Sequence, residues 1–362
     1  EVLGILQRQA RDTIGHLRRD VAMLLGVSPG SVILMLGSEI LEDLASQTLQ
    51  DSGIVDGSLV SVMCRRGCLI VTSGHDKHVR VWDIYTGNCV TDIEEKAKIN
   101  FAAVSPDGGL VVVCSESQTP KVWSSKGDTC ILELQGHDAV VSYASFSPDG
   151  QSIGTGSRDC TAMVWNMHNH ESSKGTARLT LRGHRAAVRP VNFSMDSELI
   201  VTGAEDCTAR IWHASDGVLH VKLQDHRGPV MAASFSPDGL RVATASFDGT
   251  VRIWHTSNGE CCATFSPHRY ESVVAAAFSP DGLSLVTCSC FAKDAAIWAI
   301  DDDCSRKSTL NHRSCTSVAA WLAQEEFIAV GTFTGSLHVW NAASGEHTRS
   351  ITGHKGMVTS IA

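Results

Sequence analysis

The sequence lacks several features that would place it in a common functional class. Basic residues are not in excess, because 39 acidic residues outnumber 30 basic ones and give a formal net charge of −9. A protein that binds nucleic acid needs a basic face to neutralise phosphates, so direct nucleic-acid contact is not expected. The chain also has no apolar run near the roughly 18 residues that a membrane span requires, so no membrane partner is expected.

Paired cysteines are missing as well. The chain has 13 cysteines, an odd number, and none of them forms a CxxC pair. This pattern does not fit a disulfide framework, and no cluster of Cys and His has the spacing of zinc ligands. We therefore expect reduced thiols, a cytoplasmic or nuclear location, and neither a metal nor another cofactor.

What the sequence does contain is a repeated segment. Residues 136–165 read GHDAVVSYASFSPDGQSIGTGSRDCTAMVW, in which turn residues separate three short apolar runs. This pattern predicts three β-strands that cannot bury their own faces without copies of the segment beside them. Tryptophans end seven such segments at intervals of 41 to 47 residues: Trp82, Trp123, Trp165, Trp212, Trp254, Trp298 and Trp340.

The period and its marks resemble the WD-repeat β-propeller family over residues 67–362. A histidine marks the loop before most segments, at His137, His184, His226, His268, His312 and His354, and SPDG turns recur at Ser105, Ser147, Ser236 and Ser279. The resemblance implies a mainly β fold with seven blades of four strands.

Closure of this ring needs a strand from the far end of the chain. Residues 356–362 resemble the first strand of a blade that has nothing after it. We expect this C-terminal strand to pair with the strands of residues 68–93 and so remove two exposed sheet edges. The alternative is that the chain ends where an eighth blade begins.

Residues 1–66 follow a different pattern, which resembles ubiquitin. The similarity runs from a helix start at Asp12-Thr13, through an apolar strand at 32–36, to a last strand at 59–63. It implies a small α+β ubiquitin-like (β-grasp) domain whose first strand is missing and would precede Glu1, because 2–6 supplies the second. Ubiquitin-pathway receptors are candidate partners of this domain. Conjugation is not expected, since Arg65-Arg66-Gly67-Cys68 replaces the Gly-Gly tail.

A Thr, a His and an Asp at fixed spacing invite a catalytic interpretation as nucleophile, base and orienting acid. The set occurs at least three times, however, and an active site does not need copies around a ring. We therefore expect no enzyme. The resemblance implies that these residues and the Trp form buried hydrogen-bond networks that clamp the strands: His137, Thr155, Asp159 and Trp165; His184, Thr202, Asp206 and Trp212; His226, Thr244, Asp248 and Trp254.

Three blades depart from this pattern, and we expect them to be tied less firmly. The residues at the histidine, threonine or aspartate positions are Glu95, Val113 and Ser117 in the second blade, Cys288 and Ala292 in the sixth, and Val330 and Thr334 in the seventh. The polar run 168–174, which accounts for the longest interval, is interpreted as a solvated loop.

Function must then come from surfaces, because the propeller fold hosts many roles. The histidine loops and the aspartate turns should meet on one face around the channel, where an exposed Phe or Arg is a good anchor for a partner. For any single position the alternative is an ordinary solvated rim. The candidate partner-binding residues are His75, Glu116, Arg158, Arg185, Glu205, Arg227, Phe247, Arg269, Tyr270 and Phe333.

The leading hypothesis is a non-enzymatic scaffold that docks partner proteins or peptides on this face. One alternative is a substrate receptor or adaptor in the ubiquitin ligase pathway. Such receptors often carry an Arg two residues after the Trp-Asp pair, but here Asp83 is followed by Ile84-Tyr85. The other alternative is a structural subunit of a ribonucleoprotein or RNA-processing assembly, which the acidic charge permits without direct RNA contact.

Overall fold

The computed structural model describes residues 69–362 except 85, 128, 168–173, 270, 301–303, 313 and 323–326; before that range it describes residues 17, 32–36, 39–40 and 60–64. The chain divides into two compact units, residues 1–69 with 83–88 and residues 70–82 with 89–362. Every element with described bounds is a β-strand. Among the described residues, no helix has the length and apolarity that crossing a membrane would require.

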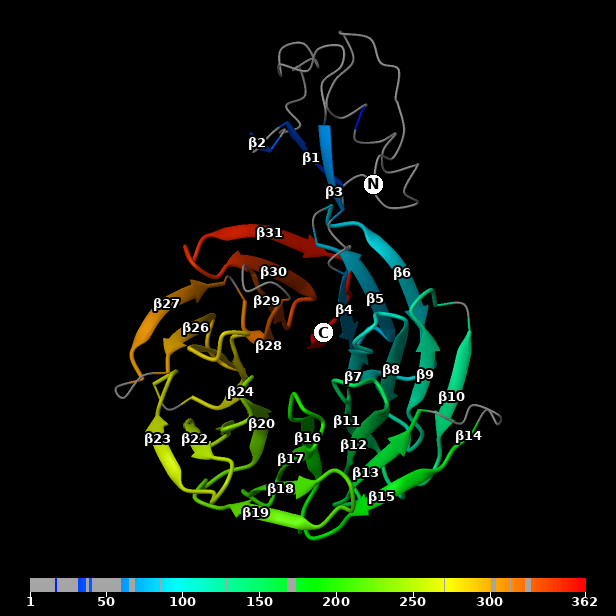
Figure 1. Ribbon diagram of the computed structural model, residues 1–362, viewed down its shortest axis with the longest axis vertical. Coiled ribbons are helices and arrows are strands. Elements are labelled where there is room, and N and C mark those ends of the chain that lie inside the picture. Colours follow the sequence, from blue (N-terminus) through cyan, green and yellow to red (C-terminus); the bar gives the residue numbers. More distant parts are fainter. Residues whose placement is uncertain are drawn as a thin grey trace. The chain divides into compact units, whose positions relative to one another are not determined.

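The larger unit is a ring of seven antiparallel sheets, which confirms the seven-bladed propeller (Figure 1). Its blades are numbered along the chain. Blade 1 contains β32 (Val358–Ile361), β4 (Leu69–Gly74), β5 (His78–Asp83) and β6 (Cys89–Glu94); blade 2, β7 (Ile99–Val104), β8 (Leu110–Ser115), β9 (Lys121–Ser124) and β10 (Cys130–Leu134); blade 3, β11 (Val141–Phe146), β12 (Ser152–Ser157), β13 (Ala162–Asn166) and β15 (Ala177–Leu181).

The other four blades follow the same order of strands. Blade 4 contains β16 (Val188–Phe193), β17 (Leu199–Ala204), β18 (Ala209–His213) and β19 (Leu219–Leu223); blade 5, β20 (Val230–Phe235), β21 (Arg241–Ser246), β22 (Val251–His255) and β23 (Cys261–Phe265); blade 6, β24 (Val273–Phe278), β25 (Ser284–Ser289), β26 (Asp294–Ala299) and β27 (Arg306–Asn311); blade 7, β28 (Thr316–Trp321), β29 (Phe327–Thr332), β30 (Ser336–Asn341) and β31 (His347–Thr352).

Packing between blades explains the small residues in the second strand of each repeat. In β12, all residues after Ser152 are buried because neighbouring blades cover both faces of the sheet. A Cβ added to Gly154 would lie 2.8 Å from Cγ1 of Val191 in blade 4, and one on Gly156 would lie 2.8 Å from the Arg189 carbonyl oxygen. Glycine at these positions therefore allows blade 4 to approach blade 3 closely.

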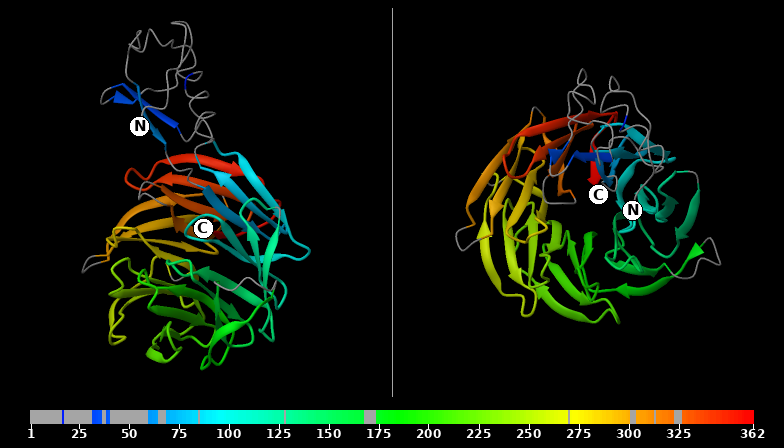
Figure 2. Two further views of the ribbon diagram at one scale, coloured as in Figure 1. Left: turned by 45° about the vertical axis from the view of Figure 1, so that its right-hand side comes forward. Right: turned by 45° about the horizontal axis from the view of Figure 1, so that its top comes forward.

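The ring is closed within blade 1 by a strand from the other end of the propeller sequence. β32 pairs antiparallel with β4, with Ser360 opposite Ser73 and Ile361 opposite Thr72. β32 also contacts β28 and β7, the inner strands of blades 7 and 2. The inner strands thus form an unbroken circle of contacts around the centre, as Figure 1 and Figure 2 show.

The described strands of the smaller unit form a separate antiparallel sheet. β1 (Val32–Leu36) lies between β2 (Glu39–Ile40) and β3 (Val60–Cys64). β3 is therefore used in this sheet, which explains why blade 1 takes its inner strand from β32 instead. The predicted helix start at Asp12 and the strand at 2–6 lie outside the described residues. The ubiquitin-like domain therefore stays a prediction.

The connection between β13 and β15 ends in a short strand, so Lys174, the last residue of the polar run that we expected to be a solvated loop, takes part in a ladder. β14 (Lys174–Gly175) pairs in parallel with residues Glu133 and Leu134 of β10, in the neighbouring blade. Gly175 lies opposite Leu134 in this ladder. The end of the connection therefore covers part of the outer edge of blade 2, which would otherwise expose unpaired backbone groups. Residues 168–173 lie outside the described part.

Antiparallel strands give the propeller two distinct faces. The histidine loops and the turns between the second and third strands lie at one end of the strands, here called the histidine face. The SPDG turns lie at the other end, here called the SPDG face. In blade 3 the Ser147 hydroxyl donates to Asp149 and accepts from the backbone N–H of Ser152, which fixes this turn.

Candidate functional site

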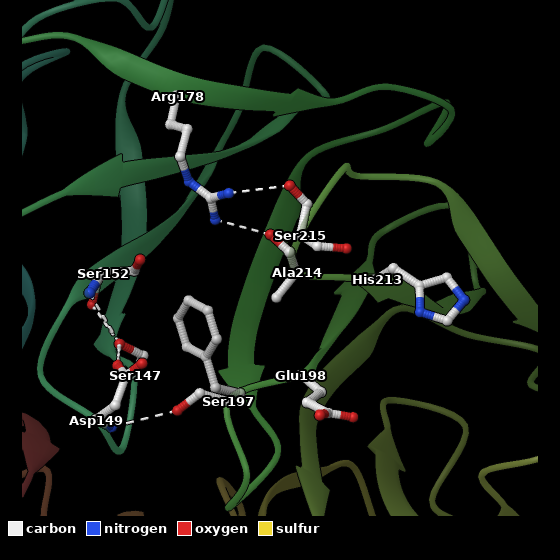
Figure 3. Close-up of a pocket in the computed structure, with 10 residues that line it drawn as sticks. Ser147, Asp149, Ser152, Arg178, Ser197, Glu198, His213, Ala214 and Ser215 are labelled. Carbon is white, nitrogen blue, oxygen red and sulfur yellow. Dashed lines mark hydrogen bonds between the residues drawn. The ribbon is translucent and has the colours of Figure 1, made fainter.

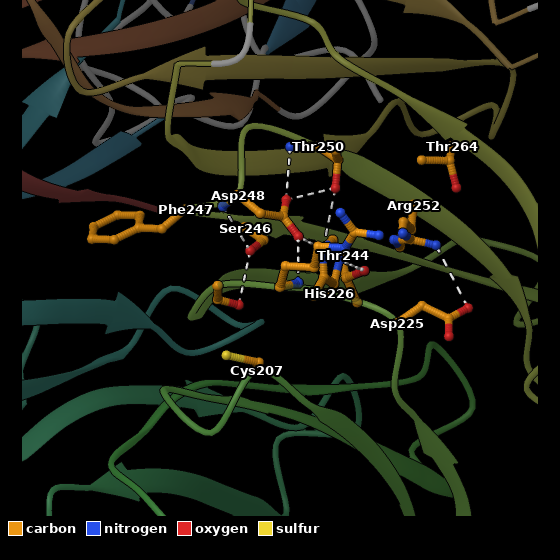
Figure 4. A network of polar contacts seen from close by, with 12 residues as sticks. Cys207, Asp225, His226, Thr244, Ser246, Phe247, Asp248, Thr250, Arg252 and Thr264 are labelled. Carbon is orange, nitrogen blue, oxygen red and sulfur yellow. Dashed lines mark hydrogen bonds and ion pairs between the residues drawn. The ribbon is translucent and has the colours of Figure 1, made fainter.

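A chain of four side chains, a buried Trp, Thr and His and a half-buried Asp, ties each regular blade together, and Figure 4 shows part of it in blade 5. The indole N–H of Trp254 donates to Thr244 Oγ1 at 2.8 Å, and Thr244 Oγ1 lies 2.8 Å from Nε2 of His226. His226 Nδ1 lies 2.9 Å from Asp248 Oδ2. Because a carboxylate only accepts, Nδ1 carries the proton and Nε2 accepts from the threonine hydroxyl.

The same four-residue network occurs in blades 3 and 4. In blade 3 the Trp165–Thr155, Thr155–His137 and His137–Asp159 distances are 2.8, 2.8 and 2.7 Å. In blade 4 the corresponding distances for Trp212, Thr202, His184 and Asp206 are 2.9, 2.8 and 3.1 Å. Each network links three different segments of one blade, so it resists separation of the loop from the sheet.

Blade 1 builds the same network from both ends of the propeller sequence. Trp82 donates to Thr72 Oγ1 at 2.7 Å, and Thr72 Oγ1 lies 2.9 Å from Nε2 of His354. His354 Nδ1 lies 2.8 Å from Asp76, which also accepts from Arg80 at 2.8 Å. The backbone ladder between β32 and β4 is thus reinforced by buried side chains.

The electrostatics favour a neutral histidine and an ionised aspartate. Burial lowers the pKa of His137, His184, His226 and His354 despite the nearby carboxylates. Burial alone would raise the pKa of Asp248, but hydrogen bonds from Thr250, from the backbone N–H of Arg227 and from His226 lower it to about 2. The neutral pairing suits a static clamp, since no proton needs to move.

This arrangement does not provide a nucleophile. The hydroxyls of Thr155, Thr202 and Thr244 lie on side chains with 0% exposure, so no substrate reaches them. Each hydroxyl oxygen also accepts the indole N–H of its tryptophan. The histidine–threonine pairs therefore hold strands together and cannot attack an external carbonyl or phosphoryl group.

In blade 6 the structure corrects the predicted positions. Thr287, not Cys288, lies 3.0 Å from both Nε2 of His268 and the indole nitrogen of Trp298. Asp294, not Ala292, lies 3.3 Å from His268 Nδ1. One extra residue lies in the loop before Thr287 and another between Thr287 and Trp298, so counting back from the tryptophan misses the threonine by one.

Asp294 does not occupy the sequence position that the network aspartate has in the other blades. It precedes Trp298 by four positions, as Thr161 precedes Trp165 in blade 3. The Thr161 hydroxyl lies 3.5 Å from His137 Nδ1, so this position already faces the histidine ring. A carboxylate there accepts from His268 without the usual aspartate turn. Blade 6 is therefore tied by a complete network, against our expectation.

Blade 2 also has a clamp, although of different chemistry. The buried Glu95 carboxylate accepts from the indole N–H of Trp123 at 3.1 Å and from Lys121 at 3.0 Å. Glu95 occupies the histidine position and bonds the tryptophan directly, past Val113 at the threonine position. The expectation of a loosely tied blade 2 therefore overlooked that a longer acidic side chain can span the gap.

Blade 7 is the blade in which the network is interrupted. Val330 occupies the threonine position, opposite His338 in the ladder between β29 and β30. The indole nitrogen of Trp340 and both ring nitrogens of His312 are buried without a hydrogen-bond partner. Burial, with a smaller effect of His338 and His347, lowers the pKa of His312 to about 4. The two rings retain only an edge-to-face contact, with centroids 5.2 Å apart.

The networks also position the surface of the histidine face. Asp248 Oδ2 accepts the backbone N–H of Arg227 at 2.8 Å, and Asp206 accepts that of Arg185 at 2.9 Å. In blade 1, Asp76 accepts the backbone N–H of Lys355 at 3.0 Å. An exposed cation thus follows a buried histidine, and its backbone is fixed by the same carboxylate that orients the ring.

The predicted partner-binding residues lie in the loops and turns of this face. The described ones are exposed: His75, Glu116, Arg158, Arg185, Glu205, Arg227, Phe247, Arg269 and Phe333. Phe247 and Phe333 are each 44% exposed, and Figure 4 shows the Phe247 ring directed away from the His226–Asp248 pair. Glu205 is paired with Arg189 at 2.8 Å. Tyr270 lies outside the described residues.

The structure adds residues to this surface that the sequence analysis missed. Phe291, in the turn between β25 and β26, is 69% exposed. It borders a hollow of about 580 Å³ between blades 6 and 7, which Cys290, Lys293, Cys315 and Phe333 also line. The sequence contains a signal for Phe291: it lies two residues after Ser289 at the end of a strand, whereas Phe247 directly follows Ser246 at the end of the corresponding strand.

A second hollow lies on the SPDG face between blades 3 and 4, with a volume of about 450 Å³ (Figure 3). Arg178 points into it but is already used, because it donates to the carbonyl oxygens of Ala214 at 2.7 Å and Ser215 at 3.0 Å. The Ser147–Asp149 turn forms the opposite wall. The Arg178 guanidinium is therefore held by the protein itself.

Metal binding finds no support in the described residues. No group of three or more His, Cys, Asp or Glu side chains among them is placed to hold a metal ion. Burial raises the pKa of the Cys114 thiol in blade 2 far above its usual range, and it raises the pKa of the Cys288 thiol in blade 6 to about 12.

Both thiols therefore stay protonated and act as small apolar core residues.

The ring of four-stranded blades and its repeated Trp–Thr–His–Asp networks define a β-propeller built from WD-type repeats. Six stretches of the chain match the family model described as "WD domain, G-beta repeat": residues 54–83, 87–124, 128–166, 175–213, 217–255 and 259–298. These matches cover more than half of the 362 residues, so the chain belongs to this family. The first match includes β3, whose place in blade 1 is taken by β32.

Several curated proteins are similar to parts of this chain. A "Target of rapamycin complex subunit wat1" from Schizosaccharomyces pombe is 27% identical over 108 residues, which are 30% of this chain and 34% of that protein. A "Nuclear distribution protein nudF" from Aspergillus niger is 26% identical over 145 residues, 38% of this chain and 32% of that protein. A "Target of rapamycin complex subunit LST8" from Bos taurus is 25% identical over 103 residues, 28% and 32% of the two chains. The matched part spans about a third of the length of these relatives.

Proposed function

We propose that this chain is a non-enzymatic scaffold that docks partner proteins or peptides on the histidine face of its propeller. One observation carries the proposal: three large aromatic side chains, Phe247, Phe291 and Phe333, are exposed on turns of that face. An isolated exposed apolar residue is common, but aromatic residues on three successive blades are a feature of interaction surfaces. Family membership supports the same role, because WD propellers act mainly through protein contacts.

The test is affinity capture with the full chain and three variants, followed by mass spectrometry. Phe247→Ser with Phe333→Ser alters the histidine face in blades 5 and 7, and Arg158→Ser with Arg185→Ser alters it in blades 3 and 4. Leu240→Ser with Leu283→Ser is the matched control, because both leucines are exposed but lie in SPDG turns on the opposite face. Thermal melts establish that each variant is folded.

We expect at least one histidine-face variant to lose specific partners that the control retains. Partners that persist in both histidine-face variants, or that only the leucine variant loses, would contradict the proposal. A partner that is lost from either histidine-face variant and kept by the leucine variant supports the proposal.

A second candidate function is membership of a larger assembly. Two relatives are named as subunits of a target of rapamycin complex, which supports a subunit role for this chain too. Co-migration of the chain with captured partners in size-exclusion chromatography tests this candidate. Recovery of ubiquitin-ligase subunits would instead favour a receptor or adaptor, and ribonucleoprotein subunits would favour an RNA-processing assembly.

A further inference from the structure

The three exposed phenylalanines belong to one continuous surface. The Phe247 carbonyl accepts from the Ser272 hydroxyl, which joins the blade 5 turn to the blade 6 loop. The Ser272 carbonyl in turn contacts Cys290, and the Phe291 carbonyl lies 3.7 Å from Cys315 Sγ in the blade 7 loop. The Phe333 backbone N–H donates to the Cys315 carbonyl at 3.1 Å. We call this surface, formed by Phe247, Cys290, Phe291, Cys315 and Phe333, the phenylalanine patch.

The hollow between blades 6 and 7, which Phe291 and Phe333 border, offers apolar contact. Backbone groups at and beside the hollow are used internally: the Phe333 N–H donates to the Cys315 carbonyl, and the Thr316 N–H donates to the Ala292 carbonyl. The hydroxyls of Ser314 and Thr334 lie 3.2 Å apart and bond to one another. A side chain that enters the hollow of about 580 Å³ therefore meets mainly rings and sulfur atoms. Such a site favours a large apolar residue.

Exposed cations lie on the same face as the phenylalanine patch, although the whole chain carries a net charge of −9. Lys293 lines the hollow itself, and Arg227, Arg269 and Lys355 follow the loop histidines of blades 5, 6 and 1. Among the residues that the structure describes, no ion pair involves any of these four cations. In the blade 6 loop, Glu271 lies two residues after Arg269 and accepts from the Ser289 hydroxyl at 3.2 Å.

From this combination we infer that the phenylalanine patch binds an acidic peptide segment that carries one large apolar side chain. The apolar residue occupies the hollow between Phe291 and Phe333, and flanking Asp or Glu residues pair with Lys293 and the neighbouring arginines. This inference rests on the proposed docking function and names the chemistry of the partner. The acidic net charge of the chain argues against nucleic acid as the occupant, because phosphate binding needs a wider basic surface.

The test is selection of a phage-displayed random peptide library on the immobilised full chain. Parallel selections use Phe291→Ser with Phe333→Ser, Lys293→Glu, and the matched control Leu240→Ser with Leu283→Ser. We expect peptides with one large apolar residue flanked by at least two acids. Their binding, measured by fluorescence polarisation of a labelled copy, should weaken about tenfold or more in the phenylalanine variant and remain unchanged in the control.

The charge component has its own readout. Binding of the selected peptide should weaken with rising salt in the native chain, and this dependence should shrink in Lys293→Glu. A basic or neutral consensus, equal enrichment on the phenylalanine variant, or no enrichment above the control background would overturn the inference.

Other occupants give distinct results that also overturn it. Tighter binding of a labelled single-stranded oligonucleotide than of any selected peptide would assign the patch to nucleic acid. A concentration-dependent dimer in analytical ultracentrifugation that Phe291→Ser abolishes would assign it to a second copy. If captured partners depend on Arg158 and Arg185 but not on the patch, the scaffold proposal stands and this inference fails.

Discussion

Thr72 Oγ1 lies 2.9 Å from His354 Nε2, although the two residues are 282 positions apart in the chain. This hydrogen bond joins β4 to the loop that leads into β32. It belongs to the same network as Trp82 and Asp76, so ring closure uses the same four-residue clamp that holds blades 3, 4 and 5.

Replacing Thr72 with valine should therefore weaken ring closure. Val fills the same volume but leaves the indole N–H of Trp82 and Nε2 of His354 buried without partners, at a cost of about 1–3 kcal/mol for each group. The free energy of unfolding in urea should fall by about 2 kcal/mol or more. Hydrogen exchange should also quicken in residues 69–74 and 358–361. The control is Thr180→Val on an exposed outer strand, and an equal effect of the two changes would contradict the assignment.

Blade 7 offers the opposite experiment, because a partner can be restored. Val330→Thr places a hydroxyl where Trp340 Nε1 and the ring nitrogens of His312 are buried and unpaired. A new hydrogen bond between such groups should raise the free energy of unfolding by about 1 kcal/mol. Val286→Thr in blade 6 is the matched control, since it adds the same hydroxyl to a buried apolar cluster and should destabilise. A lower melting temperature for Val330→Thr would refute the interrupted network.

The clamp of blade 2 should depend on the charge as well as the length of Glu95. Glu95→Ala leaves Trp123 and Lys121 without their acceptor and should reduce the free energy of unfolding by about 2 kcal/mol. Glu95→Gln keeps an acceptor for the indole but loses the ion pair, so its effect should be intermediate. Exposed Glu94→Ala should change little. Chemical denaturation of the four proteins gives the order, and a Gln variant as stable as the native chain would show that charge is unimportant.

Stability should fall as the pH drops. Burial lowers the pKa of His137, His184, His226 and His354 in the folded protein, so the unfolded chain binds more protons below pH 6.5. The free energy of unfolding therefore decreases as the pH falls through this range. It decreases again near pH 3.8 and below, because Asp159, Asp206 and Asp248 have lowered pKa values.

Melting temperatures between pH 8 and pH 5 measure the histidine contribution. His137→Gln should flatten the pH dependence as well as lower the melting temperature, whereas exposed His255→Gln should leave both nearly unchanged. A melting temperature that rises on acidification would contradict the neutral histidines.

The sequence was sufficient for the seven blades and for the residues that form the clamps of blades 3, 4 and 5. There the intervals between His, Thr, Asp and Trp are identical, so counting from one residue finds the others. In blade 6 the insertions fall in turns, and counting from Trp298 gave Cys288 in place of Thr287. Alignment of the strand pattern instead would have found it, since Val-Thr-Cys-Ser at 286–289 matches Val-Thr-Gly-Ala at 201–204.

Other parts of the site follow from geometry that spacing does not encode. Glu95 replaces a histidine by reaching directly to Trp123, which depends on side-chain length and on the burial of Val113. Phe291 lies between the paired residues Cys288 and Ala295, a segment one residue longer than that between Ala245 and Val251, so counting from the blade 5 pattern does not find it. Asp76 and Thr72 could not be matched with His354 by local spacing, since their histidine is contributed by the loop before β32.

The place of β32 in blade 1 sets the order in which the ring can be completed during synthesis. β4, β5 and β6 leave the ribosome before the strands of the other blades, but their blade lacks its inner strand until residues 358–361 have also emerged. At typical translation rates this delay is on the order of tens of seconds. Throughout it, β4 presents an open edge that can pair with other nascent chains. Chaperone demand during translation should therefore centre on residues 69–74 and end when the last strand is inserted.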